Sequence, residues 1–209
     1  MKNLTLIDHP LVKRDLTLLR DKKTPSNLFR SILRRTASLM AYEVTRDLRL
    51  KTVSVETPLE KTKGQVVIDS IILIPILRAG LGLVGGFVEV MPNARVGHIG
   101  LYRDEETLTP VDYYLKTPKN LKDALVLILD PMLATGGSGS AAVSFIKNKG
   151  ARRIRFVSLV AAPEGVKTLT KAHPDVKIFA CALDRQLNLK GYILPGLGDA
   201  GDRIFGTED

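Results

Sequence analysis

Residues 125–138 read Leu-Val-Leu-Ile-Leu-Asp-Pro-Met-Leu-Ala-Thr-Gly-Gly-Ser, and this stretch indicates how the chain folds. Residues 125–129 are an unbroken apolar run, which is typical of a strand buried on both faces of a parallel sheet. From residue 141 to 146 apolar residues recur at helical spacing, and a Lys-Gly pair at 149–150 supplies the stop signal. The pattern predicts a strand, then a loop that begins at Asp130, then a helix.

The loop between that strand and that helix is suited to hold a phosphorylated sugar. A helix begins with free backbone N–H groups and the positive end of its dipole, and Gly136 and Gly137 let a phosphate approach that backbone closely. Thr135 and Ser138 add hydroxyl donors, and Asp130 is placed to accept hydrogen bonds from sugar hydroxyls. These residues predict a ribose 5-phosphate cradle, but a tight turn before a capped helix would use the same residues. The missing Lys after the glycines argues against a Walker-type loop.

Length and composition limit the class of protein. At 209 residues the chain is long enough for one good core and short for two, so we predict a single domain over residues 1–209. No apolar run approaches the ~20 residues of a membrane helix, and the N-terminus lacks a signal-peptide pattern, so we expect a cytoplasmic protein. The lone Cys181 is predicted to be a small core residue, and three scattered histidines do not suggest a zinc site.

The net charge of +9 is concentrated near the N-terminus. Residues 1–63 carry 14 Lys and Arg against 7 Asp and Glu, and the remainder carries 17 against 15. An excess of this kind favours an acidic partner or RNA in some proteins, but solvated helix faces explain most of them. We therefore expect neither a nucleic-acid partner nor a membrane partner.

Residues 1–63 predict a helical arm and a hairpin at the edge of the sheet. Residues 10–19 suit a short amphipathic helix, and Ser26 is placed to cap a longer helix whose apolar positions repeat near helical spacing. From residue 52 to 57 apolar and polar residues alternate, and Lys63-Gly64 is predicted to be the turn of the hairpin.

Arg78 follows the next buried strand. Residues 70–77 repeat the continuous apolar pattern, and Pro75 is expected where that strand leaves its pairing, because proline cannot donate to a ladder. A guanidinium at the carboxyl end of a sheet strand is well placed for phosphate oxygens. An ordinary arginine at a helix start would look the same from these residues alone.

Further strands complete an alternation with helices. They are predicted at residues 95–101, 154–160 and 176–183. From residue 70 onward the chain therefore predicts a parallel sheet with helices on both faces. Residues 111–115 alternate again after a polar, acidic stretch, which predicts a protruding hairpin.

Four motifs resemble those of the type I phosphoribosyltransferases and, within them, of the uracil phosphoribosyltransferase family. Residues 130–138 are similar to the motif that binds phosphoribosyl pyrophosphate (PRPP), with Pro131 where most of the superfamily has a second acid. Pro-Ile-Leu-Arg-Ala-Gly at 75–80 resembles the pyrophosphate loop, and residues 102–110, between two strand-like arms at 95–101 and 111–115, lie where the family has a flexible loop that closes over PRPP. Tyr-Ile-Leu-Pro-Gly-Leu-Gly-Asp-Ala-Gly-Asp-Arg at 192–203 is very similar to the uracil-binding hood.

The resemblance covers nearly the whole chain and implies both a fold and an activity. The fold is α/β, the type I phosphoribosyltransferase fold, with a central parallel sheet flanked by helices, a protruding β-hairpin loop and a C-terminal hood over residues 184–209. The activity is transfer of the phosphoribosyl group from PRPP to uracil, which gives uridine monophosphate (UMP) and pyrophosphate in pyrimidine salvage. Without the resemblance, the glycine-rich tail would be interpreted as a structural loop.

The resemblance also implies roles for individual residues. Contacts to PRPP are implied for Arg78, Arg103, Asp130, Pro131, Met132, Leu133, Ala134, Thr135, Gly136, Gly137, Ser138 and Asp199. Contacts to uracil are implied for Ile193, Gly198, Asp199 and Ala200. As catalytic groups, Arg78 and Arg103 would take up charge on the departing pyrophosphate, and Asp199 would act either on magnesium through water or on uracil N1. Mg²⁺ would arrive with PRPP, and no protein cage for it is expected.

Two other functions stay open. A phosphoribosyltransferase for another base would keep the PRPP motif but need a different hood. An RNA-binding pyrimidine regulator on the same fold is supported only by the N-terminal excess of positive charge. Members of the family often form dimers or larger assemblies and some respond to GTP, so we expect a homodimer or higher homo-oligomer, with GTP as a candidate effector.

Overall fold

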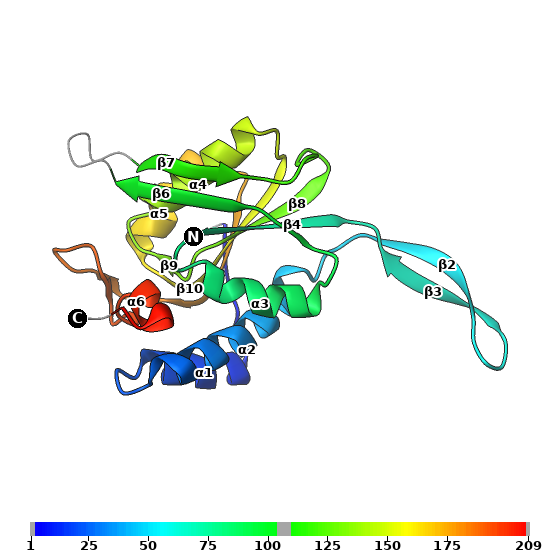
Figure 1. Ribbon diagram of the computed structural model, residues 1–209, viewed down its shortest axis with the longest axis horizontal. Helices are drawn as coiled ribbons and strands as arrows, with labels where there is room; N and C mark the ends of the chain where they lie inside the picture. The colour runs from blue at the N-terminus through cyan, green and yellow to red at the C-terminus, as the bar shows by residue number, and fades with distance from the viewer. Residues whose placement is uncertain (1–2, 104–109, 208–209) are drawn as a thin grey trace.

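The computed structural model describes residues 3–103 and 110–207, and of residues 102, 103 and 110–112 it describes the backbone alone. Its centre is a mostly parallel sheet (Figure 1). Seven strands follow in the order β1 (Leu4–Leu6), β11 (Lys177–Leu183), β10 (Arg153–Ala161), β8 (Ala124–Leu129), β4 (Ser70–Leu77), β6 (His98–Arg103) and β7 (Pro110–Lys116). Neighbours along this path run parallel except β6 and β7. The predicted parallel sheet is confirmed, and so is the hairpin formed by β6 and β7.

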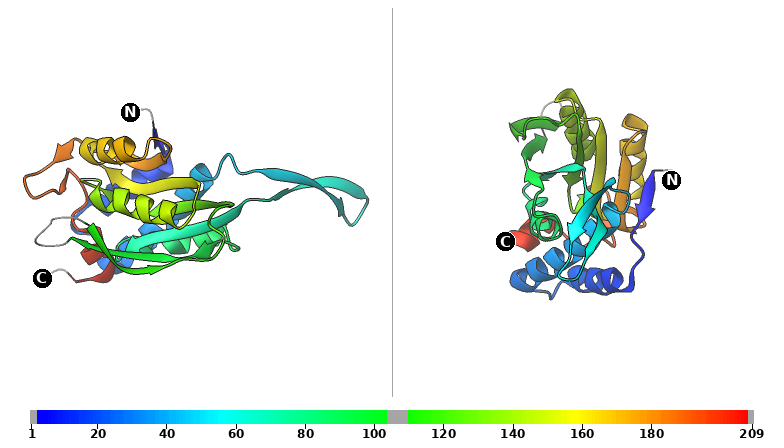
Figure 2. Two further views of the ribbon diagram at one scale, coloured as in Figure 1. Left: turned by 90° about the horizontal axis from the view of Figure 1, so that it is seen from above. Right: turned by 90° about the vertical axis from the view of Figure 1, so that its right-hand side faces the viewer.

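Helices cover both faces of the sheet (Figures 1 and 2). One face carries α1 (Pro10–Arg20), α2 (Ser26–Val44), α3 (Leu81–Val90) and α6 (Ala200–Phe205), and the other carries α4 (Gly137–Asn148) and α5 (Pro163–Ala172). Successive residues of β8 supply the two cores in turn, with Leu125 and Leu127 on the first face and Val126 and Ile128 on the second. The strand is apolar throughout because both of its faces are buried. No helix in the two described ranges is long and apolar enough to cross a bilayer.

The predicted N-terminal hairpin exists, but its turn and its place were wrong. Strands β2 (Leu50–Glu56) and β3 (Lys61–Val67) pair only with each other and project from the body as an exposed ribbon (Figures 1 and 2). The turn is at residues 57–60, where Thr57 N donates to Glu60 O at 3.0 Å. Gly64 lies inside β3 opposite Val53, and a Cβ there would come within 2.8 Å of Val55 Cγ2. The glycine therefore makes room for a cross-strand neighbour and does not turn the chain.

Asp69 anchors the base of this ribbon. Its carboxylate accepts hydrogen bonds from Arg49 N at 2.8 Å and Arg49 Nε at 2.9 Å, so the residues before β2 and after β3 are held together. The Arg153 guanidinium contacts the same carboxylate at 2.5 Å and ties it to β10. Burial alone would raise the pKa of Asp69, but the two arginines outweigh it and hold that pKa well below its ordinary value.

Three local features complete the comparison with the sequence. Pro75 is the last β4 residue paired with β8, and the pairing with β6 starts at Ile76, so the expected break in pairing is confirmed. Ser26 is the first residue of α2 and Pro25 occupies the cap position without a side-chain cap bond, so the predicted cap was wrong. The edge strand β1 was missed, because three residues carry too little pattern to be recognised.

Candidate active site

The carboxyl ends of β4 and β8 lie side by side and open into one cavity. The two strands are parallel neighbours, so the residues that follow them, Arg78 and Asp130, come from adjacent strand ends. The cavity has a volume of about 250 Å³ and is lined by Ile76, Leu77, Arg78, Ala79, Leu101, Asp130, Ser138, Asp199 and Gly201. Four predicted site residues lie in this lining: Arg78 of the pyrophosphate loop, Asp130 and Ser138 of the PRPP motif, and Asp199 of the hood.

The PRPP motif folds as a short strand followed by a helix start. Met132 and Leu133 form strand β9, which pairs with the end of β10. Pro131 is buried, and its carbonyl accepts hydrogen bonds from Leu159 N at 3.0 Å and Val160 N at 3.1 Å. The side chains of Pro131 and Leu133 thus belong to the scaffold that fixes the loop, although the resemblance had implied contacts with PRPP.

The first turn of α4 forms the mouth of the cradle. Gly136 caps this helix in a left-handed conformation with φ of 84°, and a Cβ on it would lie 2.7 Å from Gly165 O of α5. Only glycine meets both conditions without strain. Thr135 and Ser138 are exposed beside the first N–H groups of α4, which have no partner within the helix. The arrangement offers hydroxyl and backbone donors to an anion.

Asp130 is the acid at the bottom of this cavity. Its carboxylate accepts a hydrogen bond from Met132 N at 3.3 Å and keeps part of its surface open to the cavity. Dense packing around the group disfavours the charged form and raises its pKa to about 7, with a smaller contribution from the like charge of Asp199. Partners that donate hydrogen bonds to the ionised form, such as sugar hydroxyls, would lower that pKa again.

Arg78 meets the hood across the cavity mouth. Its guanidinium Nη2 lies 3.2 Å from Asp202 Oδ1, and its Cζ lies 5.9 Å from the centre of the Phe205 ring. The peptide bond between Leu77 and Arg78 is cis. Asp202 was not among the residues predicted from the sequence, although it belongs to the hood motif that carried the resemblance.

The hood consists of a small hairpin and a short helix. Strands β12 (Gln186–Leu187) and β13 (Ile193–Leu194) pair with each other, and α6 follows. Asp199 caps α6, because its carboxylate accepts a hydrogen bond from Asp202 N at 3.0 Å. Gly201 packs close to the Arg78 loop, since a Cβ on it would lie 3.9 Å from Ala79 Cβ.

Three of the residues implied to bind uracil do not line the cavity. Ile193 and Ala200 are buried in the core shared with α1, α2 and α3, and Gly198 adopts a φ of 79° in the turn before α6. For Ile193 and Ala200, the backbone is therefore the part that is left to meet a ligand. Asp199 is the one residue of this group that lines the cavity.

Arg203 fixes the hood against the N-terminal helices. This buried guanidinium donates to the carbonyl oxygens of Leu19, Leu197 and Asp21, the last two at 2.9 Å and 2.6 Å. Its Cζ also lies 4.5 Å from the centre of the Phe29 ring. The sequence pattern did not indicate Arg203, because an arginine between Asp202 and an apolar pair gives no sign of burial.

The side chain of Arg103 lies outside the described residues. Its backbone is the last of β6 and pairs with Pro110 of β7, so the residue stands at the start of the hairpin loop. The acidic tip of that loop, residues 104–106, also lies outside the described ranges. The role of Arg103 stays a prediction.

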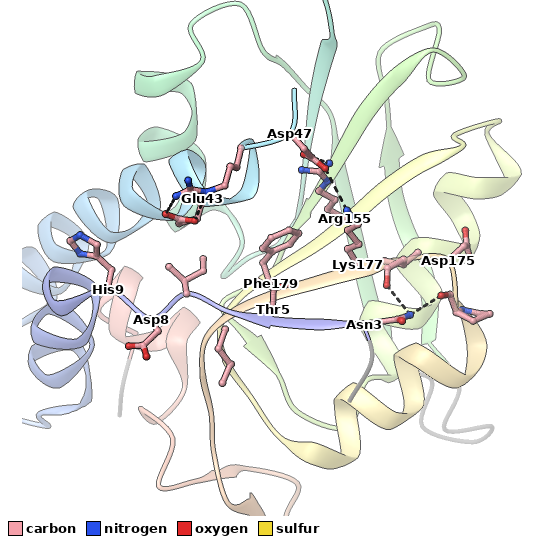
Figure 3. Close-up of a pocket in the computed structure, with 15 residues that line it drawn as sticks. Asn3, Thr5, Asp8, His9, Glu43, Asp47, Arg155, Asp175, Lys177 and Phe179 are labelled. Carbon is pink, nitrogen blue, oxygen red and sulfur yellow. Dashed lines mark hydrogen bonds and ion pairs between the residues drawn. The ribbon is translucent and has the colours of Figure 1, made fainter. Parts of the chain in front are cut away.

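A larger cavity, of about 770 Å³, lies elsewhere, between β1, β11 and the end of α2 (Figure 3). Its charged side chains are already paired: Arg155 contacts Asp47 at 2.6 Å and Arg46 contacts Glu43 at 2.7 Å, while Asp8 and Asp175 pair with lysines outside the lining. None of the predicted site residues whose side chains the structure describes lines it. The smaller cavity is therefore the candidate active site, because, of these two cavities of the described residues, it is the one that joins groups suited to a phosphorylated sugar.

Comparisons with known proteins agree with this location. The family model described as uracil phosphoribosyltransferase matches residues 6–207. A uracil phosphoribosyltransferase of Finegoldia magna is 54% identical over the full length of both chains. The solved structure of AQ2163 protein from Aquifex aeolicus is 38% identical and covers 98% of this chain and 99% of its own, with a TM-score of 0.92.

A more distant structure shares the fold alone. It is a hypoxanthine-guanine phosphoribosyltransferase from Bacillus anthracis, which is 12% identical, covers 76% of this chain and 80% of its own, and has a TM-score of 0.52. The type I phosphoribosyltransferase fold predicted from the sequence is thus confirmed. Taken with the family match over residues 6–207 and the full-length relative, the cavity at the ends of β4 and β8 leads to one assignment: the chain is an enzyme of the uracil phosphoribosyltransferase family.

Proposed function

We propose that this chain transfers the phosphoribosyl group of PRPP to uracil, which yields UMP and pyrophosphate. The observation that carries the proposal is the shared cavity, which joins the cation Arg78, the carboxylates Asp130 and Asp199, and the first turn of α4 at Ser138. A ribose with phosphates at both ends needs anion-binding groups on two sides and a hydroxyl acceptor between them. The name of the Finegoldia magna relative supports uracil as the base.

The reaction is a displacement at the anomeric carbon. The bond to pyrophosphate breaks and the bond to uracil N1 forms, with inversion and an oxocarbenium-like transition state, so the protein supplies position and charge stabilisation rather than a nucleophile. Residues 135–138 hold the 5-phosphate, and Asp130 accepts hydrogen bonds from ribose hydroxyls. Arg78 and Arg103 take up the charge on the departing pyrophosphate.

The hood recognises uracil mainly through its backbone. The side chains of Ile193 and Ala200 are buried in the core, and Gly198 presents no side chain to a flat base. Backbone N–H, C=O and N–H groups match uracil O2, N3–H and O4. Cytosine presents the opposite polarity at N3 and N4, so its groups would stay buried without partners.

Magnesium is expected to arrive with PRPP, and it neutralises pyrophosphate charge when bound. The cavity offers two carboxylates, Asp130 and Asp199, and within the described ranges no group of three His, Cys, Asp or Glu could hold a metal. This suits an ion that keeps phosphate and water ligands. Asp130→Asn and Asp199→Asn would both show a raised magnesium requirement if their carboxylates support the ion. Lost turnover in Asp199→Asn with an unchanged magnesium requirement would instead favour a role at uracil N1.

Several expectations from the sequence remain predictions. They are a homo-oligomeric state, an effect of GTP, a cytoplasmic location and the lack of a nucleic-acid partner. Light scattering tests the first, and GTP titration of initial rates tests the second. RNA retention that weakens steeply with salt would favour the alternative of an RNA-binding regulator.

The test of the proposed activity is product formation from PRPP and Mg²⁺, with uracil, cytosine, orotate and hypoxanthine supplied separately. UMP formed from uracil alone supports the proposal. A product from another base instead would point to a different hood specificity, and no product from folded protein would overturn the proposal. Asp130→Ala and Arg103→Ala should each reduce turnover strongly while leaving the protein folded.

A further inference from the structure

We propose that Asp202 is the counter-ion of Arg78 in the ligand-free site and that it competes with pyrophosphate for this guanidinium. The inference rests on the proposed function, because it assigns the pyrophosphate of PRPP to Arg78. Asp202 is a positioning residue in this account, since it acts through Arg78 and not on the substrate.

The contact between the two side chains is a single one and is open to solvent. Arg78 Nη2 and Asp202 Oδ1 are 3.2 Å apart, and the side chains are 59% and 33% exposed. A pair of this kind contributes little free energy and is easily exchanged for another anion. The Arg20–Asp184 pair between α1 and the hood is different, because it has two contacts of 2.8 Å and 2.6 Å and the Asp184 side chain is only 5% exposed.

Asp202 is held in place independently of Arg78. Its backbone N–H donates to Asp199 in the cap of α6, and Thr207 Oγ1 lies 2.6 Å from the same Oδ1 that faces Arg78. The carboxylate therefore keeps its position when the guanidinium leaves. The Arg78 guanidinium also contacts the Phe205 ring, whose centre lies 5.9 Å from Cζ, so the cation stays beside the cavity when no ligand is bound.

Figure 1 shows α6 beside the first turn of α3, where the Arg78 loop ends. The closeness of Gly201 to Ala79, within 3.9 Å of a Cβ built on Gly201, agrees with this view. Of the cap residue Asp199 and Asp202 of α6, Asp199 lines the cavity and Asp202 does not. When pyrophosphate binds, the Arg78 guanidinium thus leaves Asp202. When pyrophosphate dissociates, the guanidinium pairs with Asp202 again.

The test compares Asp202→Asn with the unmodified protein by calorimetric binding of Mg-PRPP, Mg-pyrophosphate and UMP without turnover. Asparagine keeps the oxygen that faces Thr207 and removes the charge. We expect Mg-PRPP and Mg-pyrophosphate to bind about 3-fold more tightly to Asp202→Asn, as loss of an exposed ion pair allows. UMP lacks pyrophosphate, so its affinity should stay unchanged, and ribose 5-phosphate replaces UMP as this probe if UMP does not bind.

Glu89→Gln is the matched control, because Glu89 forms an equally long, exposed pair with Arg34 at 3.2 Å away from the cavity lining. It should change none of the affinities. If the affinity for UMP rose by the same factor, the effect would be a general one of charge and the inference would be overturned. An unchanged affinity of Asp202→Asn for Mg-pyrophosphate, or no binding of Mg-pyrophosphate to either protein, would overturn it as well. Uracil turnover is measured separately, so a failed proposed function and a failed role for Asp202 give different results.

Discussion

Arg20 and Asp184, 164 residues apart in the sequence, form an ion pair with two contacts that ties α1 to the start of the hood. Arg20 Nη1 and Nη2 reach the two carboxylate oxygens at 2.8 Å and 2.6 Å. Both residues also hold Gly196, whose carbonyl accepts from Arg20 at 2.7 Å and whose N–H donates to Asp184 at 2.9 Å. Both backbone groups of Gly196 are therefore held, the carbonyl by Arg20 of α1 and the N–H by Asp184, which itself pairs with Arg20.

Replacing Asp184 with Asn should loosen the hood. The change leaves Arg20 without a charged partner in a mostly buried position, which should cost about 2 kcal/mol, or about 4–8 °C in melting temperature for a chain of this size. Asp175→Asn is the control, because Asp175 pairs with Lys147 at 2.6 Å on the surface, and it should cost under about 0.5 kcal/mol. Thermal melts check both values, and equal losses would contradict this role for Asp184.

Gly136→Ala should weaken the phosphate cradle. The new Cβ would have to tolerate a left-handed backbone and a contact of 2.7 Å with Gly165 O, so the loop should shift and the KM for PRPP should rise about 10-fold or more. Gly150→Ala shares the left-handed conformation, with φ of 95°, but its Cβ would meet no atom within 4 Å. It should lose about 1 kcal/mol of stability and keep the KM of the unmodified protein. Steady-state kinetics on the two variants separate backbone strain from displacement of the loop.

Asp130 should make the ligand-free protein less stable as pH rises. Its folded pKa is about 7, whereas an unfolded aspartate titrates near pH 4, so the folded chain holds the proton across this range while the unfolded chain releases it. Asp130→Asn should therefore be more stable than the unmodified protein at pH 8, by up to about 4 kcal/mol for a shift of about three pKa units, and should lose that advantage by about pH 4. Denaturant titrations at both values test this, and a difference that does not vary with pH would argue against it.

Asp69→Asn should free the base of the β2–β3 ribbon. The folded pKa of Asp69 lies below its unfolded value, so the ionised group stabilises the fold above about pH 4 and this contribution is lost as pH falls further. At pH 7 the variant should lose about 1–2 kcal/mol, since Arg49 stays partly solvated. Hydrogen exchange should quicken in residues 50–67 and stay slow in β8, whereas a uniform change would contradict a local anchor.

Cys181 should be inert towards thiol reagents in the folded protein. Burial among apolar neighbours of β11 raises the pKa of its thiol to about 12, so almost no thiolate is present at neutral pH. Alkylation by iodoacetamide at pH 7.5 should be at least about 100-fold slower than in the protein unfolded by guanidinium. Comparable rates in the two states would show that the thiol is accessible.

Much of the fold could be predicted because a strand that is buried on both faces is apolar at consecutive residues. The apolar runs of β4 and β8 are continuous because helices cover both faces of the sheet, and β10 shows the same pattern apart from Arg153, Arg155 and Ser158. The β2–β3 ribbon is exposed and has no continuous apolar run, and the prediction of a turn at Gly64 was wrong. Gly64 serves a cross-strand contact with Val55, which depends on the pairing of the two strands and not on local sequence.

By itself, the sequence determined the strand, loop and helix around Asp130, the position of Arg78 after a buried strand, and the family to which these motifs belong. Periodicity and glycine content are local properties, so they can be recognised along the chain. Only the tertiary structure decided that Asp202 faces Arg78, that burial and, to a smaller extent, Asp199 raise the pKa of Asp130, and that Arg20, Asp184 and Arg203 hold the hood. Each of these depends on the distance between segments far apart in the chain, and such distances are set by packing.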